Sequence, residues 1–225
     1  MARTNFIIIG AQRAATTYLA AILDRHPEIE MAKPFLPEPK YLLQKVEYSS
    51  HFKTNKVCGE KTTSYMYDDK IPAKLKKIMS NCKIVVVLRN PVERAISHYS
   101  MSCFHKLEIR NPQSAFFGEV PKTPLNVSMS PYAYLEYSQY MKYIRPFMNL
   151  FPVKIALYEE VIDLKLDELF AFLNVEKCEI KPMKKIHSYP KQSMPLEILD
   201  KLQRYFEPSI QQVEEEINLC LDHWR

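Results

Sequence analysis

Two short apolar runs, each followed by a turn and a helix-like segment, constrain the fold of this chain most strongly. The runs are Phe6–Ile9 and Ile84–Leu88. Runs of this length and composition are typical of parallel strands buried on both faces. Each following segment begins with cationic and hydroxyl side chains. Because a helix N-terminus after a buried strand is a natural anion site, the pattern predicts two such sites and a ligand with two anionic groups.

Strand-like and helix-like segments alternate along the rest of the chain. Besides the first two, we expect strands near residues 28–31, 56–58 and 153–157. We expect helices over residues 16–24, 72–80, from 91, 131–148, 166–173 and from 195, the last one interrupted by Pro208. Residues 104–130 are rich in Pro and are expected to form an irregular surface excursion. This alternation predicts a three-layer α/β/α fold with a mostly parallel sheet of about five strands.

Composition bounds the class of protein. The chain has 225 residues, 47% of them hydrophobic, so one domain over residues 1–225 is the expectation. A net charge of +5 suits an anionic small ligand and, without a basic stripe, does not favour nucleic acid. No apolar run approaches the ~20 residues that span a bilayer, so we expect no membrane segment. The oligomeric state is left open.

The cysteines and glycines add two expectations. Five scattered cysteines include no C-x-x-C pair, which argues against zinc. Their odd number, and a first strand that begins close to Met1, favour reduced thiols and a cytoplasmic location. Glycine is rare, and Gly10 and Gly59 each follow a strand-like run. We therefore expect turns that need the backbone freedom of glycine at these two positions.

The segment after Ile9 has the character of an anion-binding loop. It comprises Gly10, Ala11, Gln12, Arg13, Ala14, Ala15, Thr16 and Thr17. Successive backbone N–H groups would point at an oxyanion, assisted by the helix dipole. Arg13 adds a fixed charge, and the two threonines add hydroxyl donors. The alternative is an ordinary strand–helix turn capped by a threonine.

A nucleoside-triphosphate site is disfavoured by the same residues. The phosphate loop of such proteins needs G-x-x-x-x-G-K-[ST]. Here Ala15 stands in place of the second Gly, and Thr16 in place of the Lys. The second strong strand ends in Arg89-Asn90-Pro91 and offers no acidic residue for magnesium. A kinase or ATPase remains an alternative, but this chain lacks the residues with which such enzymes bind magnesium.

Taken together, the two stretches resemble the sulfotransferases that use 3′-phosphoadenosine 5′-phosphosulfate (PAPS). The first is similar to their 5′-phosphosulfate loop, G-x-x-K-x-G-T-T-x-L. The second is similar to their 3′-phosphate motif, R-x-P-x-x-R-A-x-S-x-Y, and matches it at Arg89, Pro91, Arg94, Ala95, Ser97 and Tyr99. Weaker similarity lies in residues 37–42, 59–62 and 157–160. The pattern most resembles the heparan-sulfate and bacterial carbohydrate branch, and covers residues 5 to about 206.

The resemblance implies a P-loop NTPase-like sulfotransferase fold and an enzyme that transfers a sulfuryl group to an acceptor hydroxyl of a glycan or small molecule. PAPS would be the co-substrate, and no metal would be required. Residues 10–17 would hold the 5′-phosphosulfate, and Arg89 and Ser97 the 3′-phosphate. Lys184 and Lys185 lie where the family covers the nucleotide, although a solvated basic loop is an equal alternative. Arg94 is expected to form a surface ion pair.

Three residues are the catalytic candidates implied by the resemblance. Glu38, held between two prolines, would remove the acceptor proton; the alternative is an exposed loop carboxylate. Lys61 would lie beside the transferred group, while its neighbour Glu60 is expected to be structural. Arg13 replaces the lysine of the family and cannot donate a proton, so it would act electrostatically. Ala15 replaces a glycine, which matters only if the position requires a positive φ.

Two alternatives to a sulfotransferase stay open. One is a P-loop phosphotransferase that binds ATP with magnesium. The other is a protein that binds the nucleotide without turnover, because Arg13 and Ala15 depart from the family pattern. The acceptor cannot be read from the sequence. Five tyrosines are expected to crowd the helix over residues 131–148 as core and interface residues, namely Tyr132, Tyr134, Tyr137, Tyr140 and Tyr143.

Overall fold

The computed structural model describes residues 4–44, 52, 55–125, 127, 129–184 and 189–225. The chain divides into two compact units. Unit 1 consists of Met1–Leu88 and Tyr143–Ile186, and unit 2 consists of Arg89–Lys142 and His187–Arg225. The expectation of a single domain therefore stays a prediction, and each unit is described by itself. Within the described part of the chain, no helix combines the length and apolar character that crossing a bilayer requires.

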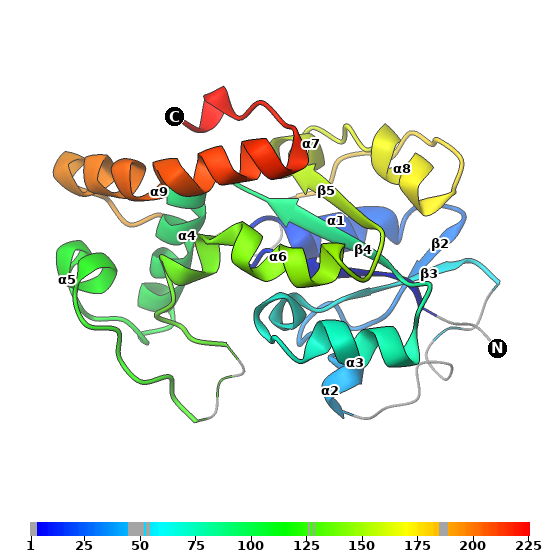
Figure 1. Ribbon diagram of the computed structural model, residues 1–225, viewed down its shortest axis with the longest axis horizontal. Helices are drawn as coiled ribbons and strands as arrows, with labels where there is room; N and C mark the ends of the chain where they lie inside the picture. Colours follow the sequence, from blue (N-terminus) through cyan, green and yellow to red (C-terminus); the bar gives the residue numbers. More distant parts are fainter. Residues whose placement is uncertain (1–3, 45–51, 53–54, 126, 128, 185–188) are drawn as a thin grey trace. The chain divides into compact units, whose positions relative to one another are not determined.

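Unit 1 is built on a parallel sheet. Its strands are β1 Thr4–Gly10, β2 Ile29–Met31, β3 Val57–Lys61, β4 Lys83–Leu88 and β5 Val153–Leu157. They lie in the order β2-β3-β1-β4-β5, and every neighbouring pair is parallel (Figure 1). The predicted sheet of about five strands is thus confirmed. Because all strands run the same way, the ends of β1, β3 and β4 share one edge.

The helices of unit 1 complete the layers. They are α1 Thr16–Leu23, α2 Tyr41–Gln44, η2 Thr63–Tyr67, α3 Ile71–Ile78, α7 Tyr158–Ile162 and α8 Asp167–Leu173. From β1 through α1 to β2 the chain moves toward one edge of the sheet, and from β3 through α3 to β4 it moves toward the other. Right-handed crossovers then place α1 and α3 on opposite faces, which gives the predicted three layers. The connections reverse direction at β1, where open α/β sheets bind ligands.

The two glycines near strand ends serve close packing, so the expectation of turns at these positions is wrong. Gly10 lies in β1 and Gly59 in β3, and in the described chain no glycine has a positive φ. A Cβ on Gly10 would meet Met66 Sδ at 2.4 Å, and one on Gly59 would meet the Phe6 ring at 2.2 Å. Glycine is needed here because the neighbouring side chains occupy the space of a methyl group.

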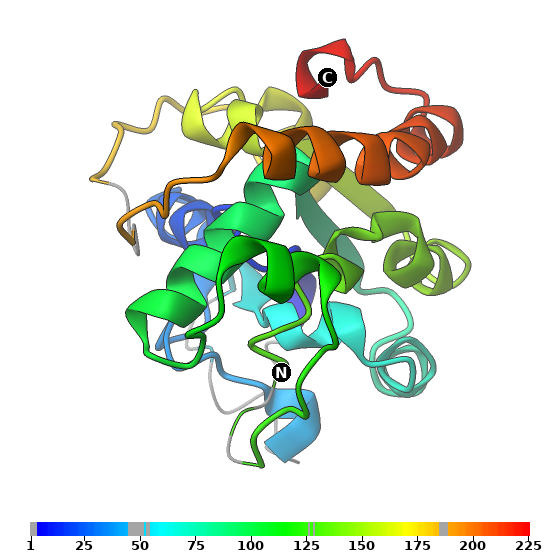
Figure 2. The ribbon, with the colours of Figure 1, turned by 90° about the vertical axis from the view of Figure 1, so that its left-hand side faces the viewer.

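Unit 2 is mainly helical. It contains α4 Pro91–Phe104, α5 Pro112–Phe117, η3 Glu136–Ser138, α9 Leu196–Ile217 and η4 Asp222–Trp224, and α6 Tyr140–Met148 begins in it. Helices α4 and α9 pack against each other (Figure 2). Pro208 does not interrupt α9 as expected, since it lies on the exposed side while Phe206 and Ile210 are buried.

Two further expectations for unit 2 are corrected. The excursion over residues 104–130 is not wholly irregular, because it contains α5, whose Phe116 is buried. The helix expected over residues 131–148 is α6 alone, preceded by turns and η3. Of the five tyrosines, only Tyr140 and Tyr143 therefore lie on that helix. Tertiary contacts explain the difference, because the carbonyl of Tyr134 accepts a hydrogen bond from Arg94 instead of continuing a helix.

Candidate functional site

The loop between β1 and α1 is tightly curled. Arg13 and Ala15 both adopt left-handed backbone conformations, with φ of 70° and 62°. The condition under which Ala15 is strained is therefore met. Ala15 is also the N-cap of α1 and provides no side-chain cap. The alternative of a threonine-capped turn is thereby excluded, and the first amides of α1 have no partner one turn before them.

Not every amide of this loop can bind an anion, which narrows the prediction for residues 10–17. Ala11 N donates to Val87 O at 2.8 Å, and Ala14 N donates to Ala11 O at 3.2 Å. Gln12 N donates to the Tyr67 hydroxyl at 3.2 Å. These three amides therefore already have partners within the protein, and the assignment of residues 10–17 to an oxyanion stays a prediction. The amides and hydroxyls of Thr16 and Thr17 remain the candidates.

Glu38 is firmly held, so the alternative of an exposed loop carboxylate is wrong. Its side chain is 10% exposed and forms an ion pair with Lys61, at 2.9 Å from Nζ to Oε1. The same oxygen accepts hydrogen bonds from Thr63 N at 3.0 Å and Thr63 Oγ1 at 2.7 Å. Among the described residues, none donates to Oε2. One oxygen of Glu38 is thus anchored while the other can accept a proton.

Lys61, the last residue of β3, joins Glu38 to the anion loop. Its side chain is only 2% exposed. Nζ donates to Glu38 Oε1 and also to Thr17 Oγ1 at 3.3 Å. Burial lowers the pKa of the Lys61 ammonium group, while the neighbouring Glu38 acts in the opposite direction. The two predicted catalytic residues therefore form one cluster with a residue of the loop.

Buried polar residues support this cluster. Glu60 is fully buried, as its expected structural role requires, and its Oε1 accepts a hydrogen bond from Thr62 Oγ1 at 2.6 Å. Thr62 Oγ1 in turn accepts one from Lys40 N at 3.2 Å. This chain of bonds fixes the backbone two residues after Glu38 relative to the end of β3.

Two contributors to the site were not predicted from the sequence. Thr63 donates to Glu38 from both its backbone N–H and its hydroxyl. Tyr67 in η2 contacts Gln12 and packs edge-on against Tyr143, with ring centroids 5.0 Å apart. Both contacts join residues far apart in the sequence. Only the hydroxyl of Thr63 directly after the Glu-Lys-Thr stretch offered a signal.

The second predicted anion site lies in unit 2, directly after β4. The side chain of Arg89 is 10% exposed, and Nε and Nη2 donate to Glu93 Oε2 at 3.2 and 2.7 Å. The Arg89 carbonyl accepts a hydrogen bond from the Tyr140 hydroxyl at 2.6 Å. Asn90 Oδ1 accepts from Val92 N at 2.9 Å and caps α4, where Pro91 occupies the first turn as predicted. Ser97 lies on α4 and is half-buried.

Arg94 does not form the predicted surface ion pair. It is 0% exposed. Nε donates to Ser138 Oγ at 2.5 Å, and Nη2 donates to the carbonyl of Tyr134. The guanidinium thus joins α4 to the segment around η3. His98 on the same helix is also buried and packs against Tyr134 at 5.0 Å between ring centroids.

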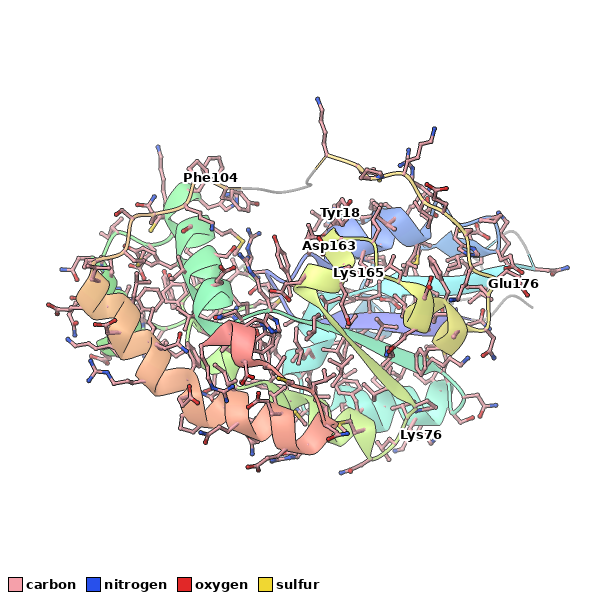
Figure 3. All side chains as sticks on the ribbon, turned by 90° about the horizontal axis from the view of Figure 1, so that it is seen from above. Tyr18, Lys76, Phe104, Asp163, Lys165 and Glu176 are labelled. Atoms are coloured by element: carbon pink, nitrogen blue, oxygen red, sulfur yellow. The ribbon has the colours of Figure 1, made fainter. Side chains whose placement is uncertain are left out.

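Of the two lysines expected to cover the nucleotide, only Lys184 can be placed. It is exposed in unit 1, whereas Lys185 lies outside the described residues. The segment before it lies against α1. Met183 N donates to the hydroxyl of Tyr18 at 3.4 Å, and Arg25 Nη1 donates to Lys181 O at 3.0 Å (Figure 3 labels Tyr18). Tyr18 belongs to the first turn of α1, so this segment follows the helix that the loop precedes.

Comparisons with known proteins agree with the geometry. The family described as sulfotransferase domain matches residues 3–214. The chain is 33% identical over 107 residues to the membrane-associated sulfotransferase kil1 of Dictyostelium discoideum, covering 44% of this chain and 23% of that protein. It is 27% identical over 157 residues to the mouse heparan sulfate glucosamine 3-O-sulfotransferase 3B1, covering 68% of this chain and 40% of that protein. The chain thus spans less than half the length of these curated relatives.

A solved structure supports the same fold. A sulfotransferase from Alicyclobacillus acidocaldarius superposes with a TM-score of 0.80 at 21% sequence identity, covering 100% of both chains. At this identity the likeness shows the fold alone. Because the family match extends over nearly the whole chain and includes β1, its loop, β3 and the Arg89 motif, this chain belongs to the sulfotransferase family.

Proposed function

We propose that this chain transfers a sulfuryl group from PAPS to an acceptor hydroxyl. The observation that carries the proposal is the cluster of Glu38, Lys61 and Thr17. In this cluster a buried ammonium group contacts both a carboxylate with one open oxygen and a hydroxyl of the anion loop. A proton acceptor and an anion site are thus linked within one unit. Membership of the sulfotransferase family supports the same chemistry.

The donor contacts follow from the two motifs. The 5′-phosphosulfate is assigned to the loop over residues 10–17, where Thr16, Thr17 and Arg13 supply donors and charge. The 3′-phosphate is assigned to Arg89 and Ser97, with Lys184 and Lys185 as further candidates. An arginine fork suits a phosphate because it can donate two parallel hydrogen bonds. These assignments rest on the family motifs and on the chemistry of the side chains.

The proposed reaction is a direct displacement at sulfur. The acceptor oxygen attacks in line, the new S–O bond forms, and the bond to the bridging phosphate oxygen breaks. Glu38 Oε2 takes the acceptor proton, and the leaving phosphate keeps the electron pair. Lys61 and Arg13 stabilise the negative charge that develops on the leaving group. The reaction needs no metal, and because a phosphate is a weak base its leaving oxygen needs no proton from Arg13.

For the acceptor we propose a glycan or small-molecule hydroxyl. Several relatives are named heparan sulfate glucosamine 3-O-sulfotransferases, which supports a sugar acceptor. Glu38 lies in a loop between Pro37 and Pro39, and loops of this kind vary on a fixed scaffold. A panel of sugars, phenols and alcohols therefore has to identify the acceptor.

Two measurements test the function. Titration calorimetry compares the product nucleotide 3′-phosphoadenosine 5′-phosphate (PAP) with ATP plus magnesium. Incubation with radiolabelled PAPS and the acceptor panel then measures transfer. Binding of PAP together with transfer is the expected result. Preferential binding of ATP with magnesium would favour a phosphotransferase instead, and PAP binding without transfer to any acceptor would favour a protein that has lost turnover.

A further inference from the structure

The Arg89 side chain is already occupied by a carboxylate from its own helix. Nε and Nη2 both donate to Glu93 Oε2. The two side chains differ in exposure, 10% for Arg89 and 51% for Glu93. Among the described residues, Arg89 is the one side chain with which the Glu93 carboxylate forms a hydrogen bond or ion pair. The pair therefore joins a largely buried cation to a carboxylate whose side chain can rotate toward the solvent.

The position of Glu93 is one that suits any anion. Glu93 lies in the first turn of α4, a helix of 14 residues, where the helix dipole favours negative charge. Its carboxylate also lies within hydrogen-bonding distance of an arginine fork, which is the donor group that phosphates prefer. A phosphate that used Nε and Nη2 of Arg89 would need the place that Glu93 Oε2 fills. Two anions at this spacing repel each other, so both cannot keep it.

We propose that Glu93 competes with the 3′-phosphate of the nucleotide for Arg89 and so limits the affinity of the site. This inference rests on the proposed function. A nucleotide with a 3′-phosphate has to displace the carboxylate, whereas one with a free 3′-hydroxyl leaves the ion pair intact. The competitor weakens the binding of PAP and thereby favours its release after transfer.

The rival explanation is that Glu93 positions Arg89 for binding. Other contacts already fix the backbone of Arg89. Its carbonyl accepts a hydrogen bond from the Tyr140 hydroxyl, and the next residue, Asn90, is tied to the carbonyl of Trp224 at 2.7 Å and caps α4. Removing the charge of Glu93 therefore leaves the backbone of Arg89 in place. The two explanations predict opposite changes in affinity.

The test is calorimetric titration of the whole chain with PAP and with adenosine 5′-phosphate, which lacks the 3′-phosphate. Glu93→Gln should tighten PAP binding about two- to fivefold, the range of a partly exposed ion pair, and leave adenosine 5′-phosphate unchanged. Glu197→Gln is the matched control, because it removes another ion pair of i,i+4 spacing, with Lys201 on α9 in the same unit. It should change neither affinity.

A double-mutant cycle completes the test. In an Arg89→Ala background, Glu93→Gln should no longer tighten PAP binding, because the guanidinium group for which Glu93 and the phosphate compete has been removed. Unchanged or weaker PAP binding by Glu93→Gln in the wild-type background would overturn the competitor role alone. Absence of PAP binding by the wild type and all variants would reject the proposed function as well. Circular dichroism verifies that each variant is folded.

Discussion

At the scale of single residues, the strained backbone of Ala15 is open to a direct test. Its φ of 62° is left-handed, where a side chain costs about 1–2 kcal/mol. Ala15→Gly removes this strain, partly offset by the greater freedom of glycine in the unfolded chain. We expect a net gain of about 0.5–1 kcal/mol in the free energy of unfolding, measured by urea denaturation. Ala14→Gly, at a buried position without positive φ, should destabilise; equal losses in both variants would contradict the argument.

Glu38 provides the test of catalysis. Glu38→Gln retains an oxygen for Thr63 and Lys61 but removes the proton acceptor. We expect kcat to fall by about 10²–10⁴-fold, the usual contribution of a general base, with the Kd of PAP unchanged. Single-turnover kinetics and calorimetry measure the two quantities. Glu168→Gln removes a surface carboxylate of the same unit and should leave kcat as it is. Full turnover in Glu38→Gln would exclude this residue as the base.

The buried Lys61 predicts a pH dependence. Burial lowers the pKa of its ammonium group, so the positive charge is lost at a lower pH than the ~10.4 of a free lysine. Since the charged form stabilises the leaving group, kcat should fall as the pH rises through this lowered pKa. Lys61→Arg stays charged because its pKa exceeds about 12, and its residual activity should lack that alkaline decline. An identical decline in wild type and Lys61→Arg would assign it to another group.

The predictability of the site differs from residue to residue. Glu38 and Lys61 could be proposed because they match family motifs, and the structure brings them together. The roles of Thr63 and Tyr67 were not predicted, because their partners, Glu38 and Gln12, are 25 and 55 positions away in the sequence. Local pattern contains no information on such pairs. Arg94 was misjudged for the same reason, since its partners Ser138 and Tyr134 come from another segment.

At the scale of secondary-structure elements, prediction succeeded where a pattern was strong and local. The apolar runs of β1 and β4, and the proline at the start of α4, were sufficient to place these elements. It failed where tertiary contacts decide the local conformation. A helix was expected over residues 131–139, but the carbonyl of Tyr134 accepts a hydrogen bond from Arg94 instead. Pro208 should break a helix, yet the buried face of α9 continues through it.

Arg94 also provides an element-scale prediction. Its guanidinium joins α4 to Ser138 and to the carbonyl of Tyr134, and it is completely buried. Arg94→Lys keeps the charge but cannot reproduce the fork, so buried acceptors lose their donor. We expect the free energy of unfolding to fall by about 2–4 kcal/mol. Chemical denaturation measures this change. Arg204→Lys, on the exposed side of α9, is the control and should stay within about 0.5 kcal/mol of the wild type.

At the scale of the whole molecule, the family and the layered α/β fold are established, while the extent of the domain and the cytoplasmic location stay predictions. The match over residues 3–214 and the five parallel strands agree with the sequence pattern. The division into two units was not anticipated, because each unit consists of two stretches that are separated in the sequence by part of the other unit. A unit made of two separate stretches has no local sequence signal.

Ligand binding should stabilise the chain in a way that tests both phosphate assignments. At a hundredfold excess over its Kd, PAP contributes about 2.7 kcal/mol, which raises the Tm of a chain of this size by about 5–11 °C. Arg89→Ala should reduce the shift with PAP and leave the shift with adenosine 5′-phosphate unchanged, because that ligand lacks the 3′-phosphate. Arg13→Ala should reduce both. Differential scanning fluorimetry at fixed ligand concentration measures these shifts. If Arg89→Ala lowered the shift for the two ligands equally, Arg89 would not be the residue that distinguishes the 3′-phosphate, and the assignment of the second motif would have to be abandoned.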